Sequence, residues 1–163
     1  MELSIAEIVV RLAVATLLTG IIGIEREIRQ KPAGVRTNAL IGLGSALMTL
    51  VGWCIWNIAP ITTDPTRMAS MVVQGVGFLG AGAIIQASGS VHGLTTAATM
   101  WVVAGIGIAC GLGLFIPALA TTLIVLVLLA IFGPLDARMM HSEEGEGKSF
   151  FRRLLKSEKE GKK

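Results

Sequence analysis

Charge is scarce in this sequence of 163 residues: Asp, Glu, Lys and Arg together make up 15%, against about a quarter in an ordinary soluble domain. Asp and Glu are missing altogether between positions 65 and 135, and tyrosine is absent from the chain. The two cysteines have neither the number nor the spacing of a disulfide scaffold. These shortages exclude a disordered chain, a secreted disulfide-rich domain and an ordinary soluble enzyme.

Hydrophobic residues take the place of the missing charge: they make up 53% of the chain, and mean hydropathy is +0.73. They gather in runs long enough to cross a hydrocarbon layer about 30 Å thick. We predict a transmembrane domain at 1–134 with five spans, at about 3–24, 37–58, 68–87, 94–110 and 114–132. One helix over 94–132 would be about 58 Å long, so a hairpin at 111–113 separates the last two spans. The predicted fold is an all-α, five-transmembrane-helix bundle with Gly/Ala-rich packing.

The distribution of Lys and Arg predicts the orientation of these spans. The loop after the first span carries four basic residues, the next loop carries Arg67 alone, and the tail at 135–163 is rich in both lysine and arginine. We therefore expect the N-terminus outside and the tail in the cytoplasm. Residues 149–159 of the tail suit a short basic amphipathic helix on anionic lipid, and a disordered solubilising tail is the alternative. Cations confined to loops and a tail do not form a nucleic-acid-binding face.

Glycines are abundant in the third predicted span, where Gly75, Gly77 and Gly80 spell G-x-G-x-x-G. A dinucleotide site would require a preceding strand and an acid about 20 residues later, and Met100 occupies that region. Helix packing through small residues is the better interpretation, although so many glycines also predict a kink or unwinding in this span. The predicted packing residues of the span are Gly75, Gly77, Gly80, Ala81 and Gly82, and the same spacing occurs at Ala15-Thr19-Gly23, Gly42-Ala46 and Gly105-Ala109.

Several polar residues fall in or beside the outer half of the predicted bundle. Arg11 lies inside the first span, where an ionised side chain costs about 2.5–3.5 kcal/mol unless it snorkels or finds a partner. Glu7 lies one turn earlier on the same face. In the predicted topology, Asp64, Arg67 and Gln74 belong to the same outer side. Snorkelling and a buried contact both remain open for Arg11.

A second polar group gathers at the cytoplasmic mouth and is our candidate functional cluster. Its members are Glu25, Arg26, Arg36 and Asn38 from the first two spans and Thr95 and Thr96 from the fourth. Arg29 is expected to lie outside it. A positive-inside loop needs cations alone, so the acids and Asn38 exceed that requirement. Either threonine would also suit a helix N-cap.

Metal and redox chemistry have little support in the sequence. His92 lacks a second ligand nearby, so no metal site is predicted. Cys54 and Cys110 lie inside apolar runs, and we interpret them as small buried hydrophobic residues. No Ser–His–acid set, metal cluster or pair of buried carboxylates can be assembled, so neither an enzyme nor a bound cofactor is predicted.

Three long motifs carry a family resemblance: GIEREIRQKPAGVRTNALIGLGSAL, DPTRMASMVVQGVGFLGAGAII and HGLTTAATMWVVAGIGIACGLGL. Over residues 8–134 the chain resembles the MgtC/SapB family of bacterial inner-membrane proteins. The resemblance implies roles in growth at low magnesium and intracellular survival of pathogens. It also implies regulation of membrane machines such as the membrane sector of ATP synthase. Longer members carry a C-terminal ACT-like domain, and we expect this chain to lack it. The family's signature positions correspond to Glu25, Arg26, Arg36, Asn38, Asp64, Arg67, Gly75, Gly80, Thr95, Thr96 and Cys110.

Two functions follow as hypotheses. The first is a non-enzymatic regulator that contacts partner membrane proteins and forms a homodimer or other homo-oligomer within the lipid bilayer. The second is a small homo-oligomeric ion transporter or channel, in which Arg11, Gln74 and the third span line the path.

Overall fold

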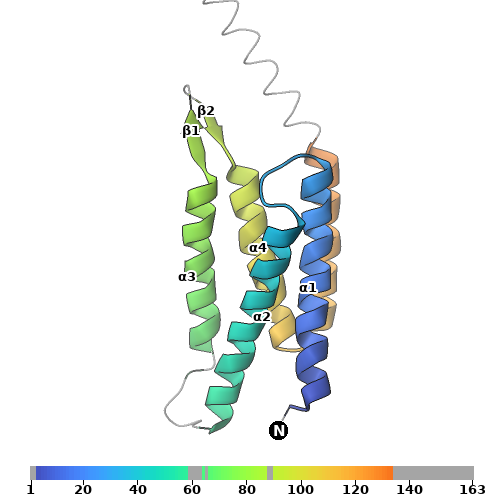
Figure 1. The fold of residues 1–163 in the computed structure, drawn as a ribbon, viewed down its shortest axis with the longest axis vertical. Coiled ribbons are helices and arrows are strands. Elements are labelled where there is room, and N and C mark those ends of the chain that lie inside the picture. The colour runs from blue at the N-terminus through green and yellow to red at the C-terminus, as the bar shows by residue number, and fades with distance from the viewer. Residues whose placement is uncertain (1–2, 59–63, 65, 88–89, 134–163) are drawn as a thin grey trace, which may run out of the picture. The chain divides into compact units, whose positions relative to one another are not determined.

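The structure, a computed structural model, describes residues 3–58, 64, 66–87 and 90–133. Within these ranges the chain forms α1 (Ile5–Ile28), α2 (Val35–Ile58), α3 (Thr66–Ala83), α4 (Leu94–Gly111) and a last helix (Phe115–Gly133). A short hairpin of β1 (Ile85–Ala87) and β2 (Ser90–His92) joins α3 to α4 (Figure 1). Met1–Leu126 form one compact unit, and the second unit, Val127–Lys163, is described as far as Gly133. The prediction for the tail lies outside the described residues.

The predicted set of five helices is confirmed within the described ranges. Four of them, α1, α2, α4 and the last helix, are long and apolar enough to cross a membrane. The third, α3, does not belong to that group, because Arg67 and Gln74 dilute its apolar content. The orientation of the termini stays a prediction.

The predicted unwinding does not occur between Thr66 and Ala83, where α3 is a continuous helix. The helix ends four residues before the predicted limit of 87, because the chain there turns into the hairpin, with Ile85 opposite His92 and Gln86 opposite Val91. β-Branched isoleucine favours strand at this point. The hairpin returns through Gly93 (φ +91), where a side chain would collide with the Ala83 carbonyl.

The helices α1, α2 and α4 pack against one another and form the core of the bundle, and they meet through glycine. The helix α3 lies on the side of the bundle away from α1 (Figure 1). A Cβ added at Gly23 would lie 2.6 Å from the Val35 Cα, and one added at Gly111 would lie 2.8 Å from the Ala46 carbonyl oxygen. Gly42 lies directly against Thr19, and Gly107 lies against Gly42. Small residues let helix backbones approach this closely in a membrane, as the spacing in the first two spans predicts.

Hydroxyl side chains fill much of this central interface without leaving donors unpaired. Thr19 donates to the Ala15 carbonyl (2.7 Å), and Thr49 donates to the Ser45 carbonyl (2.8 Å). Ser45 itself donates to the Ile41 carbonyl at 2.7 Å. Because each hydroxyl bonds within its own helix, none of the three needs a partner on the neighbouring helix.

The helix α3 packs against one side of this centre. Val76 joins Met100 and Ala104 of α4 in a hydrophobic cluster, and a Cβ added at Gly80 would lie 3.4 Å from the Ala97 Cβ. The other predicted packing residues of this span, Gly75, Gly77, Ala81 and Gly82, are exposed, and their glycines face open space within this chain. Within the described part of one chain, Gly80 packs against α4 and the other four positions do not, so a packing role for those four stays a prediction.

Gly107→Ala should destabilise the bundle because the new methyl would lie 2.7 Å from the Ser45 Cβ. We expect the free energy of unfolding to fall by about 1–3 kcal/mol, measured by equilibrium unfolding in mixed micelles. Gly105→Ala is the matched control on the same helix, since an added methyl there meets nothing within 4 Å. Equal losses for the two variants would contradict the assignment of the α2–α4 contact.

Candidate functional site

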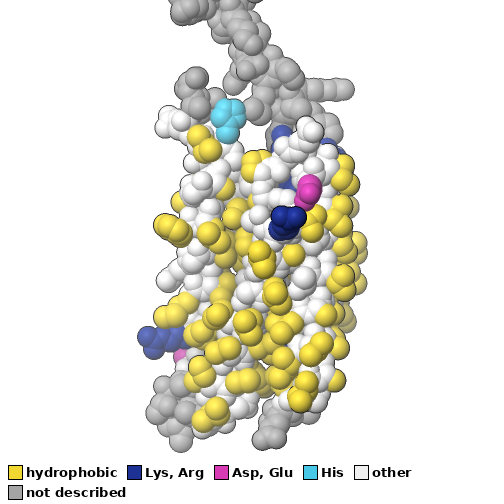
Figure 2. All heavy atoms as spheres, viewed as in Figure 1, with side chains coloured by type: hydrophobic (Ala, Val, Ile, Leu, Met, Phe, Trp, Pro, Cys, Tyr) yellow, Lys and Arg dark blue, Asp and Glu magenta, His cyan; other side chains and the backbone are white. Residues whose placement is uncertain are grey.

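One end of the bundle holds most of the predicted polar cluster. This loop end comprises the last turn of α1, the loop at 29–34, and the first turns of α2 and α4 (Figure 1). In the space-filling view, hydrophobic side chains cover the body, and the visible charged side chains lie toward the two ends (Figure 2). The loop end is therefore where polar chemistry can reach the edge of the apolar bundle.

An ion-paired group at the end of α1 is the centre of the site. The Arg26 Nε lies 2.5 Å from Glu25 Oε2, and the Arg29 Nε lies 2.6 Å from Glu25 Oε1. The Arg26 side chain is 4% exposed and that of Glu25 is 15% exposed. One carboxylate thus bridges two guanidinium groups, which leaves a net positive charge. The expectation that Arg29 lies outside the cluster is wrong, because α1 continues past the predicted end of the first span and carries Arg29 one turn beyond Glu25.

Asn38 ties the loop to the start of α2. Its side chain is fully buried, and its Nδ2 donates to the carbonyls of Ala33 and Gly34, the latter at 3.0 Å. Its Oδ1 is buried and accepts no hydrogen bond from any described residue. A buried carbonyl oxygen without a donor is costly. The two hydrogen bonds donated by Nδ2 offset that cost, so the Asn38 amide serves to hold the loop and not only to fill space.

The loop itself turns through two left-handed residues, Gln30 (φ 54) and Ala33 (φ 59). Gln30 follows the C-cap of α1, and the bonds from the Gln30 N–H to the Glu27 carbonyl and from the Lys31 N–H to the Arg26 carbonyl form a Schellman motif. Left-handed backbone at residues other than glycine is strained. Asn38 therefore holds a strained loop in place.

Glu27 closes the loop from the α1 side. Its Oε2 accepts a hydrogen bond from the Val35 N–H at 3.0 Å, at the first residue of α2. A carboxylate at a helix N-terminus stabilises the helix through its exposed amides and its dipole. The two acids in the last turn of α1 thus have separate roles: Glu25 neutralises arginine, and Glu27 caps α2.

Thr96 reaches the depth of the ion-paired group through the register of α1 and α4, which run antiparallel (Figure 1). Arg11 contacts Gly111; Arg26 lies fifteen residues after Arg11, and Thr96 lies fifteen residues before Gly111. Both steps cover about 22 Å of helix. Thr96 is 4% exposed, so it belongs to the buried part of the loop end.

Other predicted members of the cluster lie on its outside. The side chains of Arg36 and Thr95 are exposed. The suggestion that a threonine caps α4 is wrong, because the N-cap is Gly93 and makes no side-chain cap. The Thr95 carbonyl instead accepts a hydrogen bond from the Thr99 hydroxyl at 2.7 Å.

Arg11 makes a structural contact at the opposite end of the bundle. Its Nη1 donates to the Gly111 carbonyl at 2.8 Å, so a guanidinium caps the C-terminal end of α4. Gly113 (φ +80) leaves room for this side chain, since an added Cβ would lie 3.1 Å from Nη2. Glu7 instead forms a capping box with Ser4 at the start of α1. Snorkelling and a buried contact were the two alternatives for Arg11, and the structure shows the contact with the Gly111 carbonyl.

The other residues predicted on the outer side, Asp64, Arg67 and Gln74, lie apart from Arg11, on or beside α3. Asp64 caps α3: its Oδ1 accepts from the Thr66 hydroxyl (2.7 Å) and the Thr66 N–H (2.8 Å). These hydrogen bonds, the hydroxyl first, hold the pKa of the Asp64 carboxyl below its ordinary value. The side chains of Arg67 and Gln74 are exposed on α3. The predicted outer group therefore divides between the end of α4 and the free face of α3.

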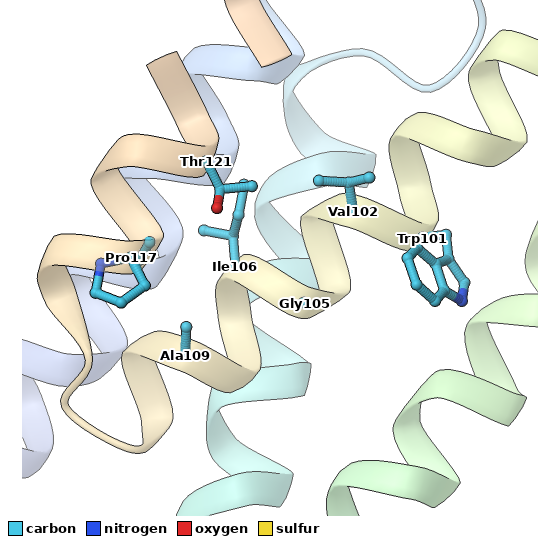
Figure 3. A pocket seen from close by; sticks show the side chains of 8 residues that line it. Trp101, Val102, Gly105, Ile106, Ala109, Pro117 and Thr121 are labelled. Atoms are coloured by element: carbon cyan, nitrogen blue, oxygen red, sulfur yellow. The ribbon is translucent and has the colours of Figure 1, made fainter. Parts of the chain in front are cut away.

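A shallow cleft of about 290 Å³ lies between α4 and the last helix (Figure 3). Its lining is mostly apolar, with the Thr121 hydroxyl and the Trp101 indole N–H as polar side-chain groups, and Gly105 and Ala109 form part of its wall. Cys110 is buried as predicted, whereas Cys54 is exposed, which corrects the expectation for that residue. No group of three or more His, Cys, Asp or Glu side chains close enough to hold a metal occurs in the described ranges.

Sequence reasoning missed the roles of Arg29 and Glu27 and the buried hydroxyls of Thr49 and Thr99. A weak signal existed for the hydroxyls. Thr49 follows Gly42 and Ser45 at intervals of three and four residues, so it shares their helix face. The roles of Arg29 and Glu27 depend on the path of the loop, for which the sequence offers no comparable pattern.

Comparison with known proteins gives a consistent result. The model of the MgtC family matches residues 12–138. "Protein MgtC" of Salmonella typhimurium strain LT2 is 47% identical over 121 residues, covering 72% of this chain and 49% of that protein. "Putative magnesium transporter YhiD" of Escherichia coli strain K12 is 41% identical over 140 residues, covering 83% of this chain and 65% of that protein. The chain therefore spans about half to two thirds of these relatives. No solved structure shows significant similarity.

Glu25→Gln should destabilise the loop end strongly, because buried Arg26 then loses its ion-pair partner. We expect a loss of about 3–5 kcal/mol in the free energy of unfolding, measured in mixed micelles. Glu27→Gln, on the same turn, is the control: its side chain is exposed, and an amide oxygen can still accept from the Val35 N–H. That variant should lose about 0.5–1 kcal/mol. A loss for Glu25→Gln no larger than that of the control would show that Arg26 does not depend on the pair.

Proposed function

The chain belongs to the MgtC family, and from this membership we propose that it is a multi-pass inner-membrane regulator that acts by contact with other membrane proteins during adaptation to low magnesium. It performs no chemical reaction of its own and needs no cofactor. The membrane sector of ATP synthase is one partner of suitable kind, and control of membrane potential would link this contact to virulence and survival inside host cells. The spans described here correspond to only part of the longer relatives, so the proposal concerns this part.

The observation that carries the proposal is the closure of the bundle centre. A Cβ could not be added at Gly23, Gly107 or Gly111 without meeting another helix. A path for ions needs polar groups around an opening, and the interface of α1, α2 and α4 is occupied by contacting backbones. The apolar lining of the cleft beside α4 suits ions no better.

The residues predicted to line a transport path support the same conclusion. Arg11 donates a hydrogen bond to the Gly111 carbonyl, and Gln74 lies on the exposed face of α3. Between Thr66 and Ala83, α3 is a continuous helix rather than the broken helix typical of transporter sites. Transport by a homo-oligomer stays the second candidate, favoured by the name given to the Escherichia coli relative.

In this proposal the loop end is the functional site. It presents a net positive group, Glu25 with Arg26 and Arg29, beneath a strained loop that Asn38 holds. Such a loop can shift between arrangements when a partner binds, because the strain of its left-handed residues opposes the hydrogen bonds that hold it. Arg36 and Thr95, which are exposed beside it, are suited to direct contact with the partner.

Asn38→Ala should abolish function while leaving the protein in the membrane. The substitution removes the bonds to Ala33 and Gly34 but no charge, so the signal for orientation is unchanged. We expect normal abundance and a loss of complementation at low magnesium, measured as growth of a strain that lacks its own family member. Lys31→Ala, an exposed change in the same loop, should complement fully.

Full growth of the Asn38→Ala strain at wild-type abundance would contradict a role for the held loop. If the Lys31→Ala strain also lost growth, the positive charge of the loop, which orients the protein in the membrane, would be all that this segment contributes. Either result would remove the loop end as the functional site.

A further inference from the structure

The exposed surface of α3 carries a row of polar and small residues beside its large hydrophobic residues, Met71, Phe78 and Leu79. By contrast, the exposed surfaces of α1 and the last helix carry large aliphatic side chains such as Leu17 and Leu123. On α3, five exposed residues recur at intervals of three and four, and all of them are polar or small: Arg67, Ser70, Gln74, Gly77 and Ala81. We call these five residues the α3 seam. Alternating intervals of three and four are the spacing by which two helices meet along a left-handed supercoil.

Gln74 lies at the depth of the middle of the bundle. Gly80 of α3 packs against Ala97 of α4, and the two helices run antiparallel (Figure 1). Gln74 is six residues before Gly80, and Val103 is six residues after Ala97. Gln74 is therefore level with Val103, near the centre of the membrane-spanning helix Leu94–Gly111.

An amide at this depth needs a partner. The side chain of Gln74 is exposed and forms no hydrogen bond with any described residue. The hydrocarbon centre of a bilayer offers neither water nor lipid headgroups to a polar side chain. Since α3 also falls outside the group of helices apolar enough to cross a membrane, its free face requires cover that the described part of one chain does not provide.

We propose that a second copy of this chain covers the seam, with the two α3 helices packed in parallel about a two-fold axis along the membrane normal. Both copies insert with the same orientation, so a two-fold axis brings each seam residue next to its own equivalent. An amide is both donor and acceptor, and two Gln74 side chains therefore satisfy each other. Ser70, whose hydroxyl is also both donor and acceptor, can pair with its equivalent in the same way nearer the start of α3.

The rest of the seam is compatible with this pairing. Gly77 and Ala81 add no bulk, so the two helices approach closely around the amide pair. The same axis brings the two Arg67 side chains near each other at the start of α3, and the exposed Asp64 carboxylates beside them offset the repulsion between these like charges. The surface thus combines opposite charges at its rim with an amide at its centre, which a lipid or an unrelated apolar helix would not match.

The proposal does not depend on the proposed function, and disulfide cross-linking in membranes tests it directly. With native Cys54 and Cys110 replaced by alanine, Ser70→Cys and Gln74→Cys should yield covalent dimers on mild oxidation. Leu79→Cys is the control on the same helix, because Leu79 is 47% exposed but lies off the seam; it should stay monomeric. Dimers at position 79 equal to those at 70, or cross-links from 70 mainly to a different protein, would overturn the proposal.

A second measurement keeps the natural cysteines and reports affinity. Energy transfer between two labelled populations of the full chain in lipid vesicles gives the dimer association constant. Gln74→Leu should lower it about tenfold, the scale of interhelical hydrogen bonds in membranes, and insertion should be unimpaired because leucine suits lipid. Gln86→Leu makes the same change at an exposed glutamine in the hairpin and should leave association unchanged. An unchanged constant for Gln74→Leu would contradict the amide pair.

Discussion

Contact between helix backbones at glycine is the constraint on which the rest of the structure depends. Helices in hydrocarbon are not driven together by the hydrophobic effect, so close packing and hydrogen bonds must hold them. The contacts of Gly23 with Val35 and of Gly107 with Gly42 fix how α1, α2 and α4 lie against one another. That register sets Arg11 at the end of α4 and Thr96 at the depth of Arg26. It also leaves α3 on the outside, with a polar face that the central helices cannot cover.

The number of helices and much of their packing could be predicted from the sequence, because apolar runs and small-residue spacing are local properties. Which small residues face inward could not. Gly42-Ala46 and Gly77-Ala81 have the same spacing, yet the first pair is buried and the second exposed. The difference arises because α2 lies between α1 and α4, whereas α3 packs along one side of the centre. Spacing defines a helix face, and the tertiary arrangement decides what that face meets.

In the candidate site, too, some residues could be predicted from local sequence and others depend on the tertiary arrangement. Glu25, Arg26 and Asn38 could be chosen from the sequence, because acids and an amide beside an apolar run exceed what an orientation signal needs. The part played by Arg29 could not, since it depends on α1 continuing for one more turn before the left-handed residue Gln30 ends it. The hairpin could not be predicted from the sequence either, because Ile85 suits an apolar span as well as a strand. Local preference was ambiguous at each of these points, and the path of the loop resolved it.

A bundle closed by backbone contacts should regulate by touching other proteins rather than by conducting ions, and magnesium flux tests that claim most directly. The full chain, reconstituted into sealed liposomes that contain a magnesium-sensitive dye, would be challenged with an inward magnesium gradient and an imposed membrane potential. The account predicts entry equal to that of protein-free liposomes at every protein density. Entry that rises with protein density and saturates with magnesium would contradict it.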